Sequence, residues 1–142
     1  MKQLGIWFRI AFAIFMVASA SLGFAQGNSS PEQLFNEYKA AQVKKDVPKM
    51  LSLVLFQSGG AAEKASWRND FESQKRRQVK VTLVPLTDYA VMLSPEARKR
   101  IRPSITLVKW LVVEDTSNDK SSQQSSLYPI GEENGKFFIV GP

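Results

Sequence analysis

The most telling fact about the possible chemistry of this chain is that it contains neither histidine nor cysteine. Without those two residue types, a zinc site of the usual nitrogen and sulfur kind cannot form. Nucleophilic catalysis by a Ser-His-Asp or Cys-His arrangement is excluded as well. The remaining catalytic options need carboxylates, lysine, tyrosine or a hard metal ion bound by oxygen.

Other acidic residues do not form a metal site by their spacing. Glu114, Asp115 and Asp119 lack the alternation of acidic and amide positions that an EF-hand loop requires. Asp70 and Glu72 are two residues apart in an expected helix, so they do not face each other. The sequence therefore predicts no metal, no cofactor and no assigned catalytic residue.

Five aromatic residues are the candidates for lining a ligand pocket. Aromatic rings can form the walls of a site for an apolar or ring-shaped ligand. The competing interpretation is that these rings fill the core of a domain that has no disulfides. The two tryptophans are of most interest, because a buried indole needs a partner for its N–H. The five are Tyr38, Trp67, Tyr89, Trp110 and Tyr128.

Cations gather in two short runs, at residues 75–77 and at Arg98, Lys99, Arg100 and Arg102. Such clusters can form a patch for an anionic surface, for example lipid headgroups or an acidic partner. The alternative is that they only face solvent. Neither run contains an aromatic residue, so the interleaved pattern of single-strand nucleic-acid binders is missing and no nucleic-acid partner is expected.

The first 25 residues have the layout of a secretory signal peptide. Lys2 and Arg9 precede an uncharged, mostly apolar run from Ile10 to Ala25 that ends in small residues. We expect cleavage after Ala25 rather than after Ala20, because the earlier cut leaves an apolar tail. An uncleaved anchor is the alternative and the only expected membrane contact, but the run of 16 residues is shorter than the roughly 20 that a span needs. The sequence thus predicts an exported protein, periplasmic or secreted.

Residues 26–142 are long enough for one ordinary domain and too few for two. The expected signal segment holds two basic and no acidic residues, so its removal lowers the net charge from +6 to +4. A charge of this size argues mainly for solubility. Without disulfides, an exported domain must be held together by packing.

Apolar spacing predicts three helices in the first half of this domain. The first covers residues 31–44, with Ser30 as N-cap, Pro31 at the first helical position and Gln33 as capping-box partner. A short apolar helix begins at Asp46 and continues through Leu55. A third helix covers residues 61–76 and ends at a basic run, which suits the negative pole of its dipole.

From residue 79 onward the apolar period changes to two, which is typical of strands. We expect strands at residues 79–84, 89–93 and 104–113, then an exposed polar loop at 114–126. A closing hairpin of residues 127–130 and 136–140, joined by a turn at 131–135, completes the pattern. The predicted fold is α+β: three N-terminal helices packed on one face of a curved antiparallel sheet of four to five strands.

This order of elements resembles the nuclear transport factor 2-like superfamily, the cone-shaped, cystatin-like α+β fold. The resemblance rests on the capped helix from Ser30, the break Lys44-Lys45-Asp46-Val47, and the last hairpin from Glu133 to Val140. It implies a pocket between the helices and the concave face of the sheet. The Asp-His pair of the family's dehydratases cannot be carried over to a chain without histidine. A tyrosine with an acid, as in the family's isomerases, would have Tyr38, Tyr89, Asp70 and Asp88 as candidates, and no spacing selects one pair. The resemblance therefore implies a fold and not an activity.

Three functions follow as hypotheses. The first is an exported, non-catalytic domain that binds a small molecule or a protein partner. The second is a cofactor-free enzyme that uses a tyrosine and a carboxylate, which a carboxylate within hydrogen-bond reach of a tyrosine hydroxyl in the pocket would favour. The third is an envelope-surface accessory protein that uses the basic clusters. A non-enzymatic role is favoured, and a homodimer through the sheet stays open.

Overall fold

The computed structural model describes residues 27–116 and 124–141. The expected signal peptide and the middle of the expected polar loop lie outside the described residues. In the part of the chain that is described, no helix is long and apolar enough to cross a membrane. The architecture is α+β, with a mixed five-stranded sheet and helices.

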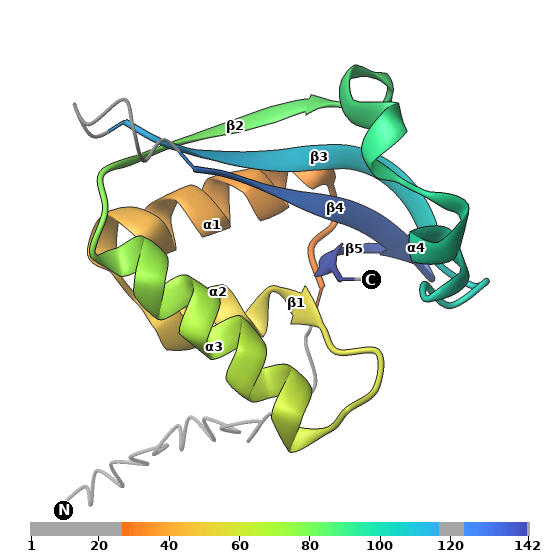
Figure 1. Ribbon diagram of the computed structural model, residues 1–142, viewed down its shortest axis with the longest axis horizontal. Coiled ribbons are helices and arrows are strands. Elements are labelled where there is room, and N and C mark those ends of the chain that lie inside the picture. The colour runs from red at the N-terminus through yellow and green to blue at the C-terminus, as the bar shows by residue number, and fades with distance from the viewer. Residues whose placement is uncertain (1–26, 117–123, 142) are drawn as a thin grey trace, which may run out of the picture.

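Figure 1 shows three helices under one face of the sheet, whose strand order is β1-β5-β4-β3-β2. A further 3-10 helix, η1, and a short helix, α4, lie together at one end of the sheet. In chain order the elements are α1 (Pro31–Lys44), α2 (Val47–Ser52), β1 (Val54–Leu55), α3 (Ala61–Lys75), β2 (Val79–Pro85), η1 (Leu86–Met92), α4 (Pro95–Lys99), β3 (Thr106–Asp115), β4 (Ser125–Glu133) and β5 (Lys136–Val140).

Helix α1 begins where its capping residues predict. The Ser30 side chain accepts a hydrogen bond from the backbone N–H of Gln33 at 3.1 Å. The Gln33 side chain reaches back and accepts from the backbone N–H of Ser29 at 2.9 Å, so two otherwise unpaired donors are satisfied. The predicted apolar face, Leu34, Tyr38 and Ala41, is buried against the sheet and the neighbouring helices.

The second helix is shorter than predicted, and this changes the sheet. Residues 54 and 55 leave the helix and form β1, which pairs in parallel with β5 through Val54 and Ile139. The predicted all-antiparallel sheet is therefore wrong, because one of its edges is a parallel pair. Strand β1 also precedes α3, so the chain does not complete its helices before its first strand.

The expected strand at 89–93 is also wrong. Residues 86–92 form η1, and α4 follows, with the Ser94 hydroxyl accepting a hydrogen bond from the backbone N–H of Ala97 at 3.1 Å. The alternation of Tyr89, Val91 and Leu93 predicts a strand with one buried face, but of these three residues only Leu93 is buried. We call residues 86–105, which connect β2 to β3, the η1–α4 excursion.

The closing hairpin is longer and tighter than predicted. Strand β4 continues through Glu133, which pairs with Lys136 of β5. The two residues between them, Asn134 and Gly135, both have positive φ, at 55° and 75°. This is the geometry that a two-residue hairpin turn requires, and the Asn-Gly sequence adopts it readily.

The two faces of the sheet are covered by different parts of the chain. Leu111 and Tyr128 point to the helices and belong to the main core. Trp110 and Val112 alternate with them along the pleat and point to the other face, where Leu93 of the η1–α4 excursion packs on them. Helices and excursion thus enclose the sheet from both sides.

Candidate functional site

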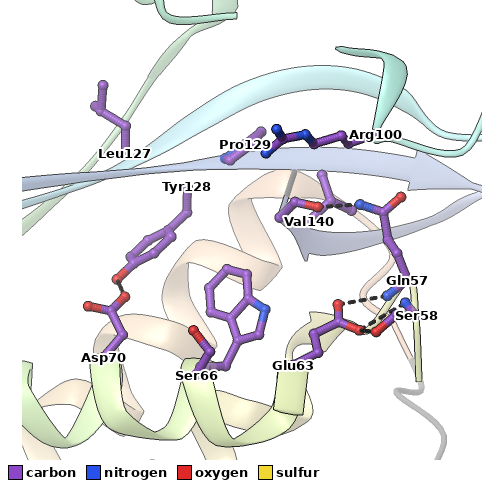
Figure 2. A pocket seen from close by; sticks show the side chains of 12 residues that line it. Gln57, Ser58, Glu63, Ser66, Asp70, Arg100, Leu127, Tyr128, Pro129 and Val140 are labelled. Atoms are coloured by element: carbon purple, nitrogen blue, oxygen red, sulfur yellow. Dashed lines mark hydrogen bonds between the residues drawn. The ribbon is translucent and has the colours of Figure 1, made fainter. Parts of the chain in front are cut away.

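A cavity of about 710 Å³ lies between α3, the loop after β1 and the edge of the sheet (Figure 2). Its lining side chains come from five segments that are distant in the sequence. They are Gln57 and Ser58 from the loop, Glu63, Ser66, Trp67 and Asp70 from α3, Arg100 after α4, Leu127, Tyr128 and Pro129 from β4, and Val140 and Gly141 at the end of β5. The volume is within the range of small-molecule sites.

The cavity exists at this edge because β5 is shorter than its neighbour. Strand β4 starts at Ser125, but its pairing with β5 covers only residues 130–133. The first half of β4 is therefore paired with β3 on one side and unpaired on the side of β5. Pro129 lies in this half, where a residue without a backbone N–H is tolerated because β5 does not continue past it.

Helix α3 presents one line of side chains to the sheet. Glu63, Trp67, Asp70 and Gln74 are spaced at i, i+4, i+7 and i+11, which puts them on one face of a helix. Gln74 is only 3% exposed, and Trp67 and Asp70 are half-buried. The helix thus directs two carboxylates, one indole and one amide toward the same side.

A chain of four polar groups links α1, α3 and β4 behind the cavity wall. The Tyr38 hydroxyl donates to the Gln74 side-chain oxygen at 2.5 Å. The Gln74 amide nitrogen donates to the Tyr128 hydroxyl, which in turn donates to the Asp70 carboxylate. Among the described residues, no buried side-chain nitrogen or oxygen lacks a partner. The Tyr38 and Tyr128 hydroxyls therefore both donate their protons to other side chains of the protein.

Burial of the two tyrosines has a direct effect on their acidity. Loss of hydration raises the pKa of Tyr38, and the nearby charge of Asp70 raises it further, against the hydrogen bond with Gln74. Loss of hydration likewise raises the pKa of Tyr128, with added contributions from Tyr38 and from the hydrogen bond to Asp70. Both hydroxyls therefore stay protonated at neutral pH.

Aromatic packing forms the apolar part of the site. The Trp67 ring lies 5.5 Å from the Tyr128 ring and 5.6 Å from the Phe71 ring, measured between centroids. Gly141 lies directly under the indole: a Cβ at this position would be 2.6 Å from Trp67 Cζ2. A side chain larger than glycine at position 141 would therefore displace Trp67.

Glu63 holds the loop at one end of the cavity. Its carboxylate accepts hydrogen bonds from the backbone N–H groups of Gln57 at 2.9 Å, Ser58 at 2.8 Å and Gly59 at 3.2 Å, and from the Ser58 hydroxyl. Partial burial acts to raise the pKa of Glu63, but these hydrogen bonds outweigh it and lower the pKa below its ordinary value. Glu63 therefore holds the loop in its ionised, carboxylate form.

Gln57 joins three segments at the same end. Its amide nitrogen donates to the backbone carbonyl of Gly141, and its amide oxygen accepts from the backbone N–H of Arg102 at 2.9 Å. The loop after β1, the end of β5 and the η1–α4 excursion are thus tied together. Figure 2 shows Gln57 and Glu63 on one side of the cavity and the contact of Tyr128 with Asp70 on the other.

Some polar groups at the cavity wall have hydrogen bonds to other described residues, and others do not. One Asp70 oxygen accepts from Tyr128, whereas no hydrogen bond within the described part of the chain involves its second oxygen. The Arg100 guanidinium and the Ser66 hydroxyl likewise have no such bond there. Within residues 27–116 and 124–141, no group of three or more acidic side chains could hold a metal ion.

The five aromatic residues predicted to line a pocket do not all meet. Trp67 and Tyr128 line the cavity, while Tyr38 lies behind Tyr128 in the core, with ring centroids 6.5 Å apart. Tyr89 and Trp110 are on the opposite face of the sheet, 6.5 Å apart, and the Trp110 indole donates to the Leu86 carbonyl at 3.0 Å. These two residues do not join the others, because adjacent residues of a strand point to opposite faces, which turns Trp110 away from the helices, and Tyr89 of η1 packs on Trp110.

The structure also separates the tyrosine–acid candidates from one another, and the four predicted basic residues from one another. Asp70 meets Tyr128, which was not among the tyrosines considered for catalysis, and Asp88 is exposed on η1. Arg100 lines the cavity, whereas Arg98 and Lys99 are exposed on α4. Arg102 forms an ion pair with Glu133 at 3.6 Å. The four cations are thus not one uniform patch.

Sequence reasoning missed Glu63, Asp70 and Gln57 as a group. A signal for the α3 residues was present: polar side chains at helical spacing on the same face as Trp67. Gln57 has no such signal, because its role depends on segments 84 and 45 residues away. No family model, no curated protein and no solved structure matches the chain.

Proposed function

We propose that this domain binds a small, ring-shaped organic molecule in the cavity beside α3, without transforming it. The observation that supports the proposal is a cavity of about 710 Å³ whose wall combines the Trp67 ring with a carboxylate oxygen of Asp70. An aromatic wall with a few convergent polar groups is the usual composition of a small-molecule site. The ligand would stack on Trp67 and direct a donor group, such as an amine or hydroxyl, to Asp70.

The state of the tyrosines supports binding over catalysis. A general acid or base needs a pKa near the working pH and a proton aimed at the substrate. Burial raises the pKa of Tyr128, and its proton is directed at Asp70. Tyr38 is fully buried, does not line the cavity, and donates its proton to Gln74.

Export and a nuclear transport factor 2-like architecture are parts of the same proposal. The apolar segment at residues 10–25 supports export. The position of the cavity, between the helices and the sheet, supports the resemblance, because that is where the family has its pocket.

Ligand binding can be tested by nuclear magnetic resonance with the assigned indole N–H signals of Trp67 and Trp110 as reporters. The probes are aromatic amines, aromatic alcohols and aromatic carboxylates of matched size. We expect amines and alcohols to shift the Trp67 signal saturably and to leave the Trp110 signal unchanged, because Trp110 is on the other face of the sheet. Shifts of both signals, or of neither, would contradict the proposal.

A second candidate function is catalysis by Asp70 as a general base, with Tyr128 as its partner. The contact of a tyrosine hydroxyl with a carboxylate at the cavity wall favours this candidate. Turnover of a bound probe that is lost in Asp70→Asn, with the probe still bound, would support catalysis. Binding without turnover in the unaltered protein would support the first function.

A further inference from the structure

The η1–α4 excursion is firmly attached to the outer face of the sheet. Tyr89 packs edge-on against Trp110, with ring centroids 6.5 Å apart, and the Trp110 indole donates to the Leu86 carbonyl at 3.0 Å. Ile101 and Ile105 are buried against Phe138 at the other end of the excursion. The excursion is therefore held against the sheet by packing near both of its ends.

Two apolar side chains at its tip are directed to solvent. Val91 is 90% exposed and Met92 is 57% exposed. In the described part of the chain, the only other large apolar residue as open as these is Val43 on α1, at 78%. Adjacent exposed apolar residues on a rigid segment are typical of an interaction surface.

Cations follow this apolar tip closely in the chain. Two residues, Leu93 and Ser94, separate η1 from helix α4, which lies at the same end of the sheet (Figure 1). It carries Arg98 and Lys99, both exposed and without an ion pair to other described residues. The excursion as a whole contains two acidic and four basic residues, of which only Arg102 pairs with an acid in the described chain.

A second cavity opens between these cations and the sheet. It has a volume of about 320 Å³, and its walls include Leu86, Ile101, Ile105 and Leu107, with Arg98 at its border. Apolar walls beside an arginine match the chemistry of an anionic amphiphile, which has an acidic headgroup and an apolar tail.

We propose that the η1–α4 excursion docks on an anionic phospholipid bilayer, with Val91 and Met92 at the boundary of headgroups and acyl chains and Arg98 and Lys99 beside lipid phosphates. Exposed apolar side chains and exposed cations within one short segment are the combination that interfacial membrane binding requires. The partner is a lipid surface rather than a nucleic acid, because no aromatic side chain on α4 is available to stack on bases. This site is separate from the ligand cavity beside α3.

The absence of cysteine allows a direct test on the full chain, because one introduced thiol is the only one. An environment-sensitive fluorophore is attached to Met92→Cys or, as the matched control, to Val43→Cys, which is exposed on α1. Vesicles contain either equimolar phosphatidylglycerol and phosphatidylcholine or phosphatidylcholine alone. Residues 1–25 are common to both labelled proteins, so their own affinity for vesicles is matched.

We expect a blue shift for the label at position 92 on anionic vesicles only, and none at position 43. The double variant Arg98→Gln, Lys99→Gln should lower partitioning of the protein onto anionic vesicles on the order of tenfold. The control Arg76→Gln with Lys80→Gln removes two exposed cations elsewhere and changes it much less. Equal shifts at positions 92 and 43, equal losses in the two charge variants, or binding to soluble heparin without binding to vesicles would each overturn the proposal.

Discussion

The Tyr128 hydroxyl donates a hydrogen bond to the Asp70 carboxylate and so joins the central strand β4 to helix α3 at the wall of the ligand cavity. Gln74 donates to the same hydroxyl and connects it to Tyr38 in the core. Because these groups are buried or half-buried, their hydrogen bonds fix the distance between helix and sheet. The cavity therefore depends on a polar network as well as on apolar packing.

Removal of the Tyr128 hydroxyl should destabilise the fold. In Tyr128→Phe, the Gln74 amide loses its acceptor and Asp70 loses its donor, so we expect the free energy of unfolding to fall by about 1–3 kcal/mol. Urea denaturation measures this change. Tyr89→Phe removes the same atom on the outer face and is the matched control; a loss as large there would contradict the assigned role of the network.

Alkaline conditions should weaken the fold through the two buried tyrosines. A tyrosine in the unfolded chain loses its proton near pH 10, whereas burial raises the pKa of Tyr38 and Tyr128 in the folded state. The folded state then binds protons that the unfolded state has released. Their contribution to stability is complete below about pH 10 and is lost as the pH rises above it, by up to about 1.4 kcal/mol per unit for each tyrosine.

This pH dependence can be measured by urea denaturation at a series of pH values on both sides of pH 10. Tyr128→Phe should have a shallower decline than the unaltered protein, and Tyr89→Phe should not. The same slope in Tyr128→Phe and the unaltered protein would show that Tyr128 titrates alike in both states.

Glu63 should control the loop after β1. In Glu63→Gln, the backbone N–H groups of Gln57, Ser58 and Gly59 lose their charged acceptor, so we expect faster hydrogen exchange at these three amides and little change in the core. Because the pKa of Glu63 is lowered in the fold, its contribution is present above the ordinary value of 4.5 and is lost as the pH falls through the lowered value. Unchanged exchange in the variant would contradict this role.

Gly141 should control the position of Trp67. In Gly141→Ala the new Cβ meets the indole, so we expect a changed Trp67 fluorescence and weaker ligand binding. The loss of stability should be at the low end of the ~1–3 kcal/mol typical of over-packing, because the half-buried ring can move outward. Gly60→Ala is the control, since a Cβ at position 60 would be 3.6 Å from the nearest atom, Ser58 Oγ, and the φ of Gly60 is −79°. Fluorescence that does not respond to Gly141→Ala would contradict the close contact.

Local chemistry made part of this fold predictable and left the rest undetermined. The Ser30 cap and the apolar spacing of α1 act within a few residues, and there the prediction is confirmed. Val54 was assigned to a helix because its local apolar pattern is compatible with one, but its pairing with Ile139, 85 residues later, places it in β1. Such a pairing has no local signal.

The candidate site, too, depends on contacts that have no local signal in the sequence. Strand β3 has apolar residues on both faces, so its pattern cannot tell which face the helices cover. Trp110 was therefore grouped with Trp67, although the pleat sends it to the other side. Trp67 and Tyr128 line the cavity, and so does Arg100, which the sequence places only in a basic run because its position depends on the unpredicted helix α4.

The most direct test of the ligand site uses disulfide capture at a single introduced cysteine. Ser66→Cys puts a thiol at the cavity wall, and Asn69→Cys puts one at an exposed position of the same helix. Both proteins are equilibrated with a library of aromatic and aliphatic disulfides under a mild reductant, and capture is measured by mass spectrometry. Binding in the cavity predicts that aromatic fragments with an amine are captured preferentially at position 66 and not at 69, and that Trp67→Ala removes the preference. Equal capture of all fragments at both positions would contradict the proposed ligand site.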